Sequence, residues 1–225
     1  MKTMLSTAAA AVGAVGALTL AAAANDILVY DDPITLTADG GGAANKTKLV
    51  RLSYNTPSGF ENVLVAVYGD AAGPDVWNYR GEFAPALDLF VTRSTDDGET
   101  WSDPVNISQT ANLTSISADH DGDPDTPEIP FYGDSEKPNI FNFGRNIVIT
   151  WVDRYVPTAE QRTARYVAFG DIEVPYAATY AIRSTDAGLT WSAPERLTDG
   201  FRDAKQDVVR GNGLGWMITW QEDPQ

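Results

Sequence analysis

Apolar positions in this chain gather in short runs that are rich in valine, isoleucine and aromatic residues. Glycine, proline, asparagine and aspartate bound these runs, of which the clearest are 62–69, 88–94, 146–153 and 178–184. Such runs predict β-strands, because branched and aromatic side chains pack well on a pleated surface. Beyond the first 24 residues no stretch has a convincing helical period, and 158–166 would form one or two turns at most. The pattern predicts an all-β protein.

The runs belong to an internal repeat. Arg93–Ser108 ("RSTDDGETWSDPVNIS") closely matches Arg183–Thr198 ("RSTDAGLTWSAPERLT"). More loosely, 137–153 matches 205–223, and 48–70 resembles both; each of these three segments begins with lysine. A repeat therefore consists of a lysine-headed strand, an apolar strand, a long loop, a third strand, an Asp-containing turn and a fourth strand.

Four antiparallel strands per repeat is the pattern of a β-propeller blade. The turn reads Ser-x-Asp-x-Gly-x-Thr-Trp in both copies and resembles the Asp box of the sialidase (neuraminidase) superfamily, also called the BNR repeat. The resemblance implies a sialidase-like β-propeller, with about two and a half four-stranded blades of an incomplete, six-bladed ring. The box residues are Ser94, Asp96, Gly98, Thr100, Trp101, Ser184, Asp186, Gly188, Thr190 and Trp191.

The repeat defines the expected organisation of the chain. A propeller is stable when its ring closes, so we expect an N-terminal part of a longer chain whose remainder completes the ring. Self-association of open fragments is the alternative. The expected segments are a signal peptide (1–24), an N-terminal segment with a ring-closing strand (25–45), blade 1 (46–108), an acidic inter-blade loop (109–136), blade 2 (137–198) and a partial blade 3 (199–225).

Folding alone accounts for the residues of the Asp box. Gly98 and Gly188 can adopt a positive φ in the turn, and Asp96 and Asp186 can accept hydrogen bonds from backbone N–H groups of their own turn. In the family that the motif resembles, these boxes lie on the side away from the active site. We therefore expect the boxes to be structural.

The amino-acid composition limits the classes of partner that the chain is expected to bind. The chain carries 31 Asp and Glu against 16 Lys and Arg, a formal net charge of −15, and has no cysteine. This charge disfavours nucleic acid and anionic membranes and favours metal cations. The single histidine, His120, excludes a multi-histidine zinc site and makes a histidine-based triad implausible.

The N-terminus has the features of an export signal. A basic start is followed by an apolar, alanine-rich stretch that ends in Ala22-Ala23-Ala24. These features predict a cleaved signal peptide, and hence a periplasmic, extracellular or cell-surface protein with no membrane span after cleavage. A retained membrane anchor is the alternative.

The long loops opposite the Asp boxes are the candidate ligand sites. They are 69–87 and 153–177, within the first and second repeats. Aromatic rings beside arginine and carboxylates suit a sugar or carboxylate ligand, or a protein partner. The alternative is that the rings pin the loops to the sheets. The candidate residues are Trp77, Tyr79, Arg80, Arg154, Tyr155, Arg165 and Tyr166.

The inter-blade loop contains an alternating acidic cluster. Carboxylates around a glycine, here Gly122, suit Ca²⁺, which takes six to eight oxygen ligands. The candidate ligands are Asp119, Asp121, Asp123, Asp125 and Glu128. An acidic linker that binds nothing is the alternative.

Catalytic residues cannot be assigned. Sialidases hold the substrate carboxylate with three arginines, the first in an Arg-Ile-Pro motif that this sequence lacks. Two hypotheses stay open: a non-catalytic propeller that binds a glycan or protein as a surface scaffold, Ca²⁺-stabilised or not, or the N-terminal part of a sialidase-like exo-glycoside hydrolase whose catalytic residues lie mostly in further blades.

Overall fold

The computed structural model of the chain describes residues 2–6, 26–30, 36–37, 44–77, 82–158, 160–212 and 214–223. The chain divides into two compact units, Met1–Thr35 and Leu36–Gln225. In the first unit, β1 (Lys2–Ser6) pairs antiparallel with β2 (Asp26–Tyr30), which lies in the segment predicted to supply a ring-closing strand. The rest of the predicted signal segment lies outside the described residues. Among the described residues, no helix is long and apolar enough to cross a membrane.

The second unit is built of antiparallel β-sheets, which confirms the predicted all-β class. Two four-stranded sheets have the orders β3-β4-β5-β6 and β9-β10-β13-β14, and they correspond to the two predicted repeats. The strands of the first are β3 (Asn45–Thr56), β4 (Gly59–Trp77), β5 (Phe83–Ser94) and β6 (Val105–Asn106). Those of the second are β9 (Glu136–Phe143), β10 (Asn146–Asp153), β13 (Ala178–Ser184) and β14 (Glu195–Arg196).

Three two-stranded sheets complete this unit. The third, shorter repeat forms the hairpin β15 (Ala204–Asn212) and β16 (Gly215–Glu222). The acidic inter-blade loop holds β7 (Thr114–Ala118) and β8 (Ile129–Tyr132), and the long loop of the second repeat holds β11 (Thr163–Tyr166) and β12 (Ile172–Pro175). Instead of the expected helical turn, the segment 158–166 ends in strand β11, and a 3₁₀ turn follows at Val167–Phe169.

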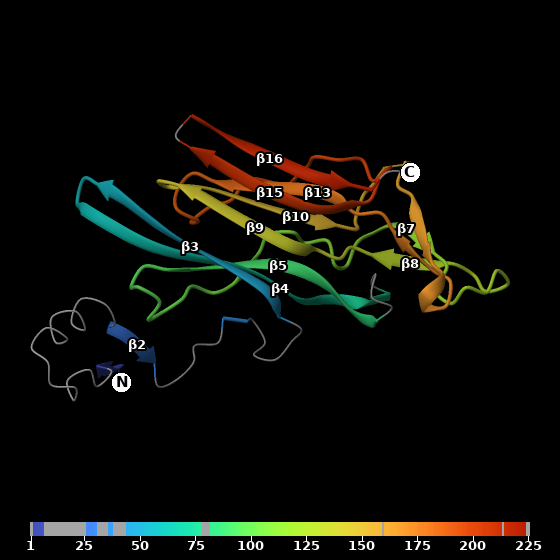
Figure 1. The fold of residues 1–225 in the computed structure, drawn as a ribbon, viewed down its shortest axis with the longest axis horizontal. Coiled ribbons are helices and arrows are strands. Elements are labelled where there is room, and N and C mark those ends of the chain that lie inside the picture. The colour runs from blue at the N-terminus through green and yellow to red at the C-terminus, as the bar shows by residue number, and fades with distance from the viewer. Residues whose placement is uncertain are drawn as a thin grey trace, which may run out of the picture. The chain divides into compact units, whose positions relative to one another are not determined.

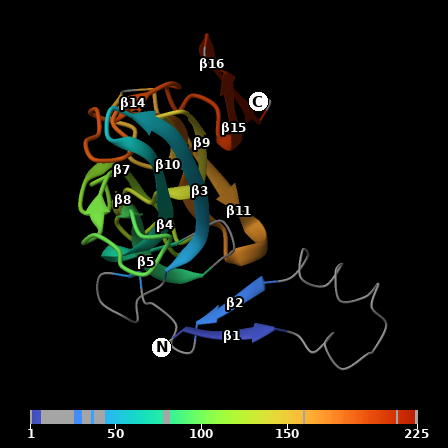
Figure 2. The same ribbon diagram turned by 90° about the vertical axis from the view of Figure 1, so that its left-hand side faces the viewer.

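The sheets of the three repeats stack in chain order (Figures 1 and 2). The first strands of the repeats are in contact, with β9 touching both β3 and β15. Alternate residues of β4, among them Val65 and Val67, pack with Ile147, Ile149 and Trp151 of β10 in one buried cluster. Because β10 lies within the stack, it is buried on both faces from Ile147 to Asp153. Apolar burial between sheets therefore joins the first two repeats.

Strand register separates the two ends of the stack. Asn45 pairs with Gly69, which pairs with Leu89, so the start of β3 and the β4–β5 connection lie at one end. Glu136 and Ala204, at the starts of β9 and β15, are paired at the same end of their own sheets. We call this the front end. The Asp-box turns, which follow Ser94 and Ser184, lie at the opposite end.

The loop predicted at 69–87 is largely wrong, because β4 continues to Trp77 and β5 begins at Phe83. Its "DAAG" stretch lacks strand-favouring side chains, so the local sequence does not predict the extension. A register shift between Ala71 and Asp75 carries the strand past Ala111. A Cβ at Gly73 would lie 2.0 Å from the Ala111 carbonyl oxygen, so close backbone approach requires glycine there.

Candidate functional site at the front end

The Asp-box turns are built by hydrogen bonds within each turn. The Asp96 carboxylate accepts from the Thr100 amide at 2.9 Å and from the Thr100 hydroxyl at 2.6 Å, and the Ser94 hydroxyl accepts from the Gly98 amide at 2.8 Å. Hydrogen bonds from Thr100 and Ser94 lower the pKa of Asp96 to about 2. Gly98 has a φ of 93°, as expected from the sequence. The polar side chains of the box therefore form hydrogen bonds within their own turn.

The second box repeats this geometry and also joins the two repeats. The Asp186 carboxylate accepts from the Thr190 amide at 2.9 Å. Partial burial opposes the shift, but hydrogen bonds from Thr190 and Ser184 lower the pKa of Asp186 to about 2. The Arg93 guanidinium of the first repeat donates to the Ala187 carbonyl at 3.0 Å, and Ala187 is fully buried. The second turn therefore docks on the neighbouring sheet.

At the front end, Trp77 and the acidic loop meet around one crevice. Its lining includes Trp77, Phe83, Asp119, His120 and Glu173. The Trp77 and Phe83 rings lie 5.3 Å apart between centroids. The crevice holds about 20 Å³, which is room for about one water molecule. Trp77 is packed against the apolar cluster beneath it, which favours the alternative that this ring pins the loop.

Among the described residues, the other predicted ligand residues of these loops make contacts within the protein itself. Tyr79 and Arg80 lie outside the described residues. Arg154 is 6% exposed, donates to the Pro175 carbonyl and lies 3.9 Å from an Asp203 carboxylate oxygen. Arg154 is thus buried among these partners, and its part in ligand binding stays a prediction from sequence.

The aromatic and basic residues near Arg154 hold the loops in place. Tyr155 accepts the Tyr180 hydroxyl proton on its backbone carbonyl, and Tyr166 packs on the apolar cluster below β11. Arg165 lies within 3.4 Å of carboxylate oxygens of Asp119, Glu173 and Asp171. It therefore ties the β11–β12 hairpin to the acidic loop.

The acidic loop uses its carboxylates as backbone caps. Asp119 accepts from the Gly122 amide at 2.9 Å, Asp121 from the Asp123 amide at 3.0 Å, and Asp123 from the Asp125 amide at 3.0 Å. Glu128 is exposed. Across the part of the chain that the structure describes, no group of three or more histidine, aspartate or glutamate side chains is arranged to hold a metal ion. Calcium binding by this loop stays a hypothesis from sequence.

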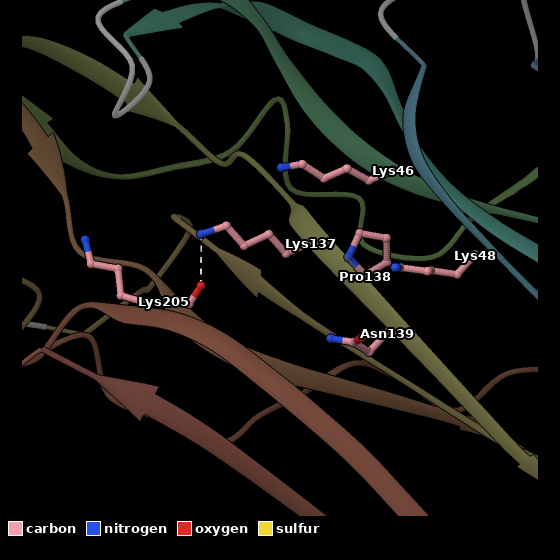
Figure 3. A pocket seen from close by; sticks show the side chains of 6 residues that line it. All are labelled: Lys46, Lys48, Lys137, Pro138, Asn139 and Lys205. Atoms are coloured by element: carbon pink, nitrogen blue, oxygen red, sulfur yellow. Dashed lines mark hydrogen bonds between the residues drawn. The ribbon is translucent and has the colours of Figure 1, made fainter.

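A cavity of about 400 Å³ lies at the front end of the three stacked repeats (Figure 3). Its lining is Lys46, Lys48, Lys137, Pro138, Asn139 and Lys205. We call it the lysine pocket. The sequence contains five lysines, and all of them except Lys2 line this cavity. This gathers four cationic side chains in a chain with a net charge of −15, although Lys46 and Lys205 also lie within 4 Å of carboxylates.

The lysines reach the pocket through a repeated backbone feature. Each first strand has a register shift against its neighbour, between Asn45 and Lys48, opposite Thr150 and Val152, and between Ala204 and Gln206. These irregularities contain Lys46, Lys137 and Lys205, and such bulges redirect a side chain. Lys46 and Lys137 also have positive φ values of 52° and 55°. A left-handed backbone conformation is strained at a non-glycine residue, and residues with such strain cluster at functional sites.

Carboxylates and carbonyls hold the lysine ammonium groups. The Lys46 Nζ lies 3.7 Å from Glu136 Oε1, and the Lys137 Nζ donates to the Lys205 carbonyl at 2.9 Å. The Lys205 Nζ lies 2.5 Å from Asp203 Oδ2. Burial opposes the shift, but Asp203 raises the pKa of Lys205 to about 12, so this side chain is cationic at neutral pH.

A buried acidic cluster adjoins the pocket, linked to it by the Lys46–Glu136 and Lys205–Asp203 ion pairs. Asp153 is fully buried and accepts from the Ser135 and Thr110 hydroxyls, each at 2.6 Å. Burial raises the pKa of Asp153, although these hydrogen bonds oppose the shift. Burial, and then the charge of Glu136, raise the pKa of Asp134 to about 7. The pocket is thus lined by cations and backed by carboxyl groups.

None of these four lysines is among the ligand residues that the sequence predicts. The available signal was the lysine that begins each repeat, but a single lysine before a strand carries no local sign of function. No protein-family model matches the chain, and no curated protein sequence matches it.

Proposed function

We propose that this chain is part of an exported, sialidase-like β-propeller that binds an acidic glycan in the lysine pocket without catalysing a reaction on it. The support for a propeller is the repeated four-stranded sheet, the stacking of β3, β9 and β15, and the Asp-box geometry in two equivalent turns. Export rests on the signal-like N-terminal sequence.

The gathering of Lys46, Lys48, Lys137 and Lys205 in one cavity carries the proposal. A volume of about 400 Å³ falls in the usual range for small-ligand sites. Ammonium groups bind carboxylate and sulfate groups by charge-assisted hydrogen bonds, and Asn139 lies beside them to orient polar groups. An acidic oligosaccharide has both anionic and hydroxyl groups for such a lining.

Binding of carboxylated and sulfated oligosaccharides, followed by calorimetry, tests this function. We expect Lys137→Ala to weaken binding about tenfold, because it removes one charge-assisted contact. Arg183→Ala is the matched control, since it removes an exposed cation remote from the pocket and leaves affinity unchanged. Equal affinity in the wild type and Lys137→Ala would exclude the pocket. Hydrolysis of the oligosaccharide would instead favour the exo-glycoside hydrolase.

A further inference from the structure

Ion pairs and nearby charges link the lysine pocket to a buried charged cluster. The Lys46 Nζ lies 3.7 Å from Glu136, and at the other side of the pocket the Lys205 Nζ lies 2.5 Å from Asp203. Arg154 lies 3.9 Å from Asp203, and Glu136 and Asp134 also act on its charge. Two pocket lysines therefore pair with carboxylates that share one buried arginine, so a change of charge in this cluster is felt in the pocket.

The cluster has more buried carboxylates than cations. Asp134, Glu136, Asp153 and Asp203 are each 9% exposed or less, and Arg154 is the one buried guanidinium among the described residues of this cluster. Glu136 Oε2 and Arg154 Nε are buried and have no hydrogen-bond partner among the described residues. Glu136 and Asp203 also face Lys46 and Lys205, but burying four carboxylates around one guanidinium is still costly. The cluster therefore gains stability when one carboxyl takes up a proton.

Among the carboxyl groups of this cluster, Asp134 has the surroundings that most favour a bound proton. It accepts the Leu87 amide proton from β5 at 3.0 Å. The charged groups that act on it are Glu136 from β9, and Asp153 and Arg154 from the end of β10. Two of these three are acidic, and the cation among them is shared with Asp203.

We propose that the lysine pocket takes up its acidic ligand together with a proton, which binds the buried Asp134 carboxyl behind it. This inference rests on the proposed function. Protonation removes one negative charge behind the lysines, which raises the positive potential at the pocket. By linkage, a bound anion favours protonation of Asp134 to the same extent. Burial already brings the pKa of Asp134 to about 7, so this exchange operates near neutral pH.

The test measures affinity for a sulfated oligosaccharide at pH 6 and pH 8 by calorimetry, in buffers of different ionisation enthalpy. Sulfate groups stay ionised across this range, so the ligand does not contribute protons. We expect wild-type affinity to fall about fivefold from pH 6 to pH 8, the effect of one nearby charge in a partly screened environment. Proton uptake on binding should accompany this difference.

Asp134→Asn supplies the decisive comparison. The amide keeps an acceptor for Leu87 and carries no charge, so this variant should bind at pH 8 as tightly as the wild type does at pH 6. Glu136→Gln is a second variant for use if Asp134→Asn does not fold. His120→Gln controls for histidine titration and should keep the wild-type pH dependence, because His120 lines the separate crevice.

Failure of the two proposals is distinguishable. Absence of binding at both pH values overturns the proposed function and the proton linkage with it. Binding that is equal at the two pH values, or an unchanged pH dependence in folded Asp134→Asn, overturns the proton linkage and leaves the lysine pocket as a binding site.

Discussion

At the scale of single residues, the backbone of Lys137 in the lysine pocket is strained. Its φ of 55° lies in the left-handed region, where a side chain is strained by about 1 kcal/mol. Lys46 has the same conformation in the preceding repeat, with a φ of 52°. A glycine would adopt this backbone conformation without strain, whereas lysine adds a cationic side chain to the pocket lining.

Replacement of this residue should separate stability from binding. We expect Lys137→Gly to be more stable than Lys137→Ala by about 1 kcal/mol, because glycine adopts a positive φ without a Cβ clash. Both variants should lose ligand affinity equally. Urea denaturation with parallel calorimetry measures the two effects. A Lys137→Ala variant at least as stable as Lys137→Gly would show that the backbone at this position is not strained.

At the scale of elements, we expect the predicted Asp-box turn between β13 and β14 to be structural. Asp186→Ala removes the acceptor for Thr190 and Ser184, and should lower the free energy of unfolding by about 1–2 kcal/mol. Exposed Asp103, whose carboxylate has no hydrogen bond in the first turn, gives the control Asp103→Ala. Affinity at the lysine pocket should not change in either variant. A loss of affinity in folded Asp186→Ala would contradict a purely structural box.

The elements themselves differ in how far sequence predicts them. The strands at 146–153 and 178–184 follow from branched and aromatic side chains, and the Asp box specifies its own turn through Ser, Asp and Gly. The extension of β4 through Gly73 depends on Ala111, which is distant in the chain. Such an element depends on tertiary contact, and local propensity cannot reveal it.

The candidate site was less predictable than the strands for the same reason. Arginine is a residue type that binds carboxylate ligands, but Arg154 is held in the interior by Asp203 and the Pro175 carbonyl. Lys46, Lys137 and Lys205 come from three different repeats, and only the contacts among β3, β9 and β15 bring them together. The repeated lysine is visible in the sequence, but the cavity depends on how the strands stack.

At the scale of the whole molecule, buried carboxyl groups govern the response to pH. Burial raises the pKa values of Asp134, Asp153 and Asp207. A carboxyl whose folded-state pKa lies above its unfolded value near 4 holds a proton in the folded state that the unfolded chain has released. Stability from such a group is greatest below about pH 4 and declines up to its folded-state pKa. Asp96 and Asp186 act oppositely, because their lowered pKa values contribute stability above about pH 4 that is lost as the pH falls towards 2.

These opposite contributions place the stability maximum in mildly acidic solution. For Asp134, with a folded-state pKa of about 7, the free energy of unfolding should fall by about 1 kcal/mol per pH unit between pH 5 and pH 7 and level off above pH 7. The net charge of −15 acts in the same direction, since protonation reduces self-repulsion. Thermal unfolding from pH 3 to pH 9 measures this profile.

Asp134→Asn should flatten the slope between pH 5 and pH 7, because the amide cannot ionise. A wild type that gains stability from pH 5 to pH 8, or an Asp134→Asn variant with the wild-type slope, would show that this carboxyl is already ionised in the folded protein.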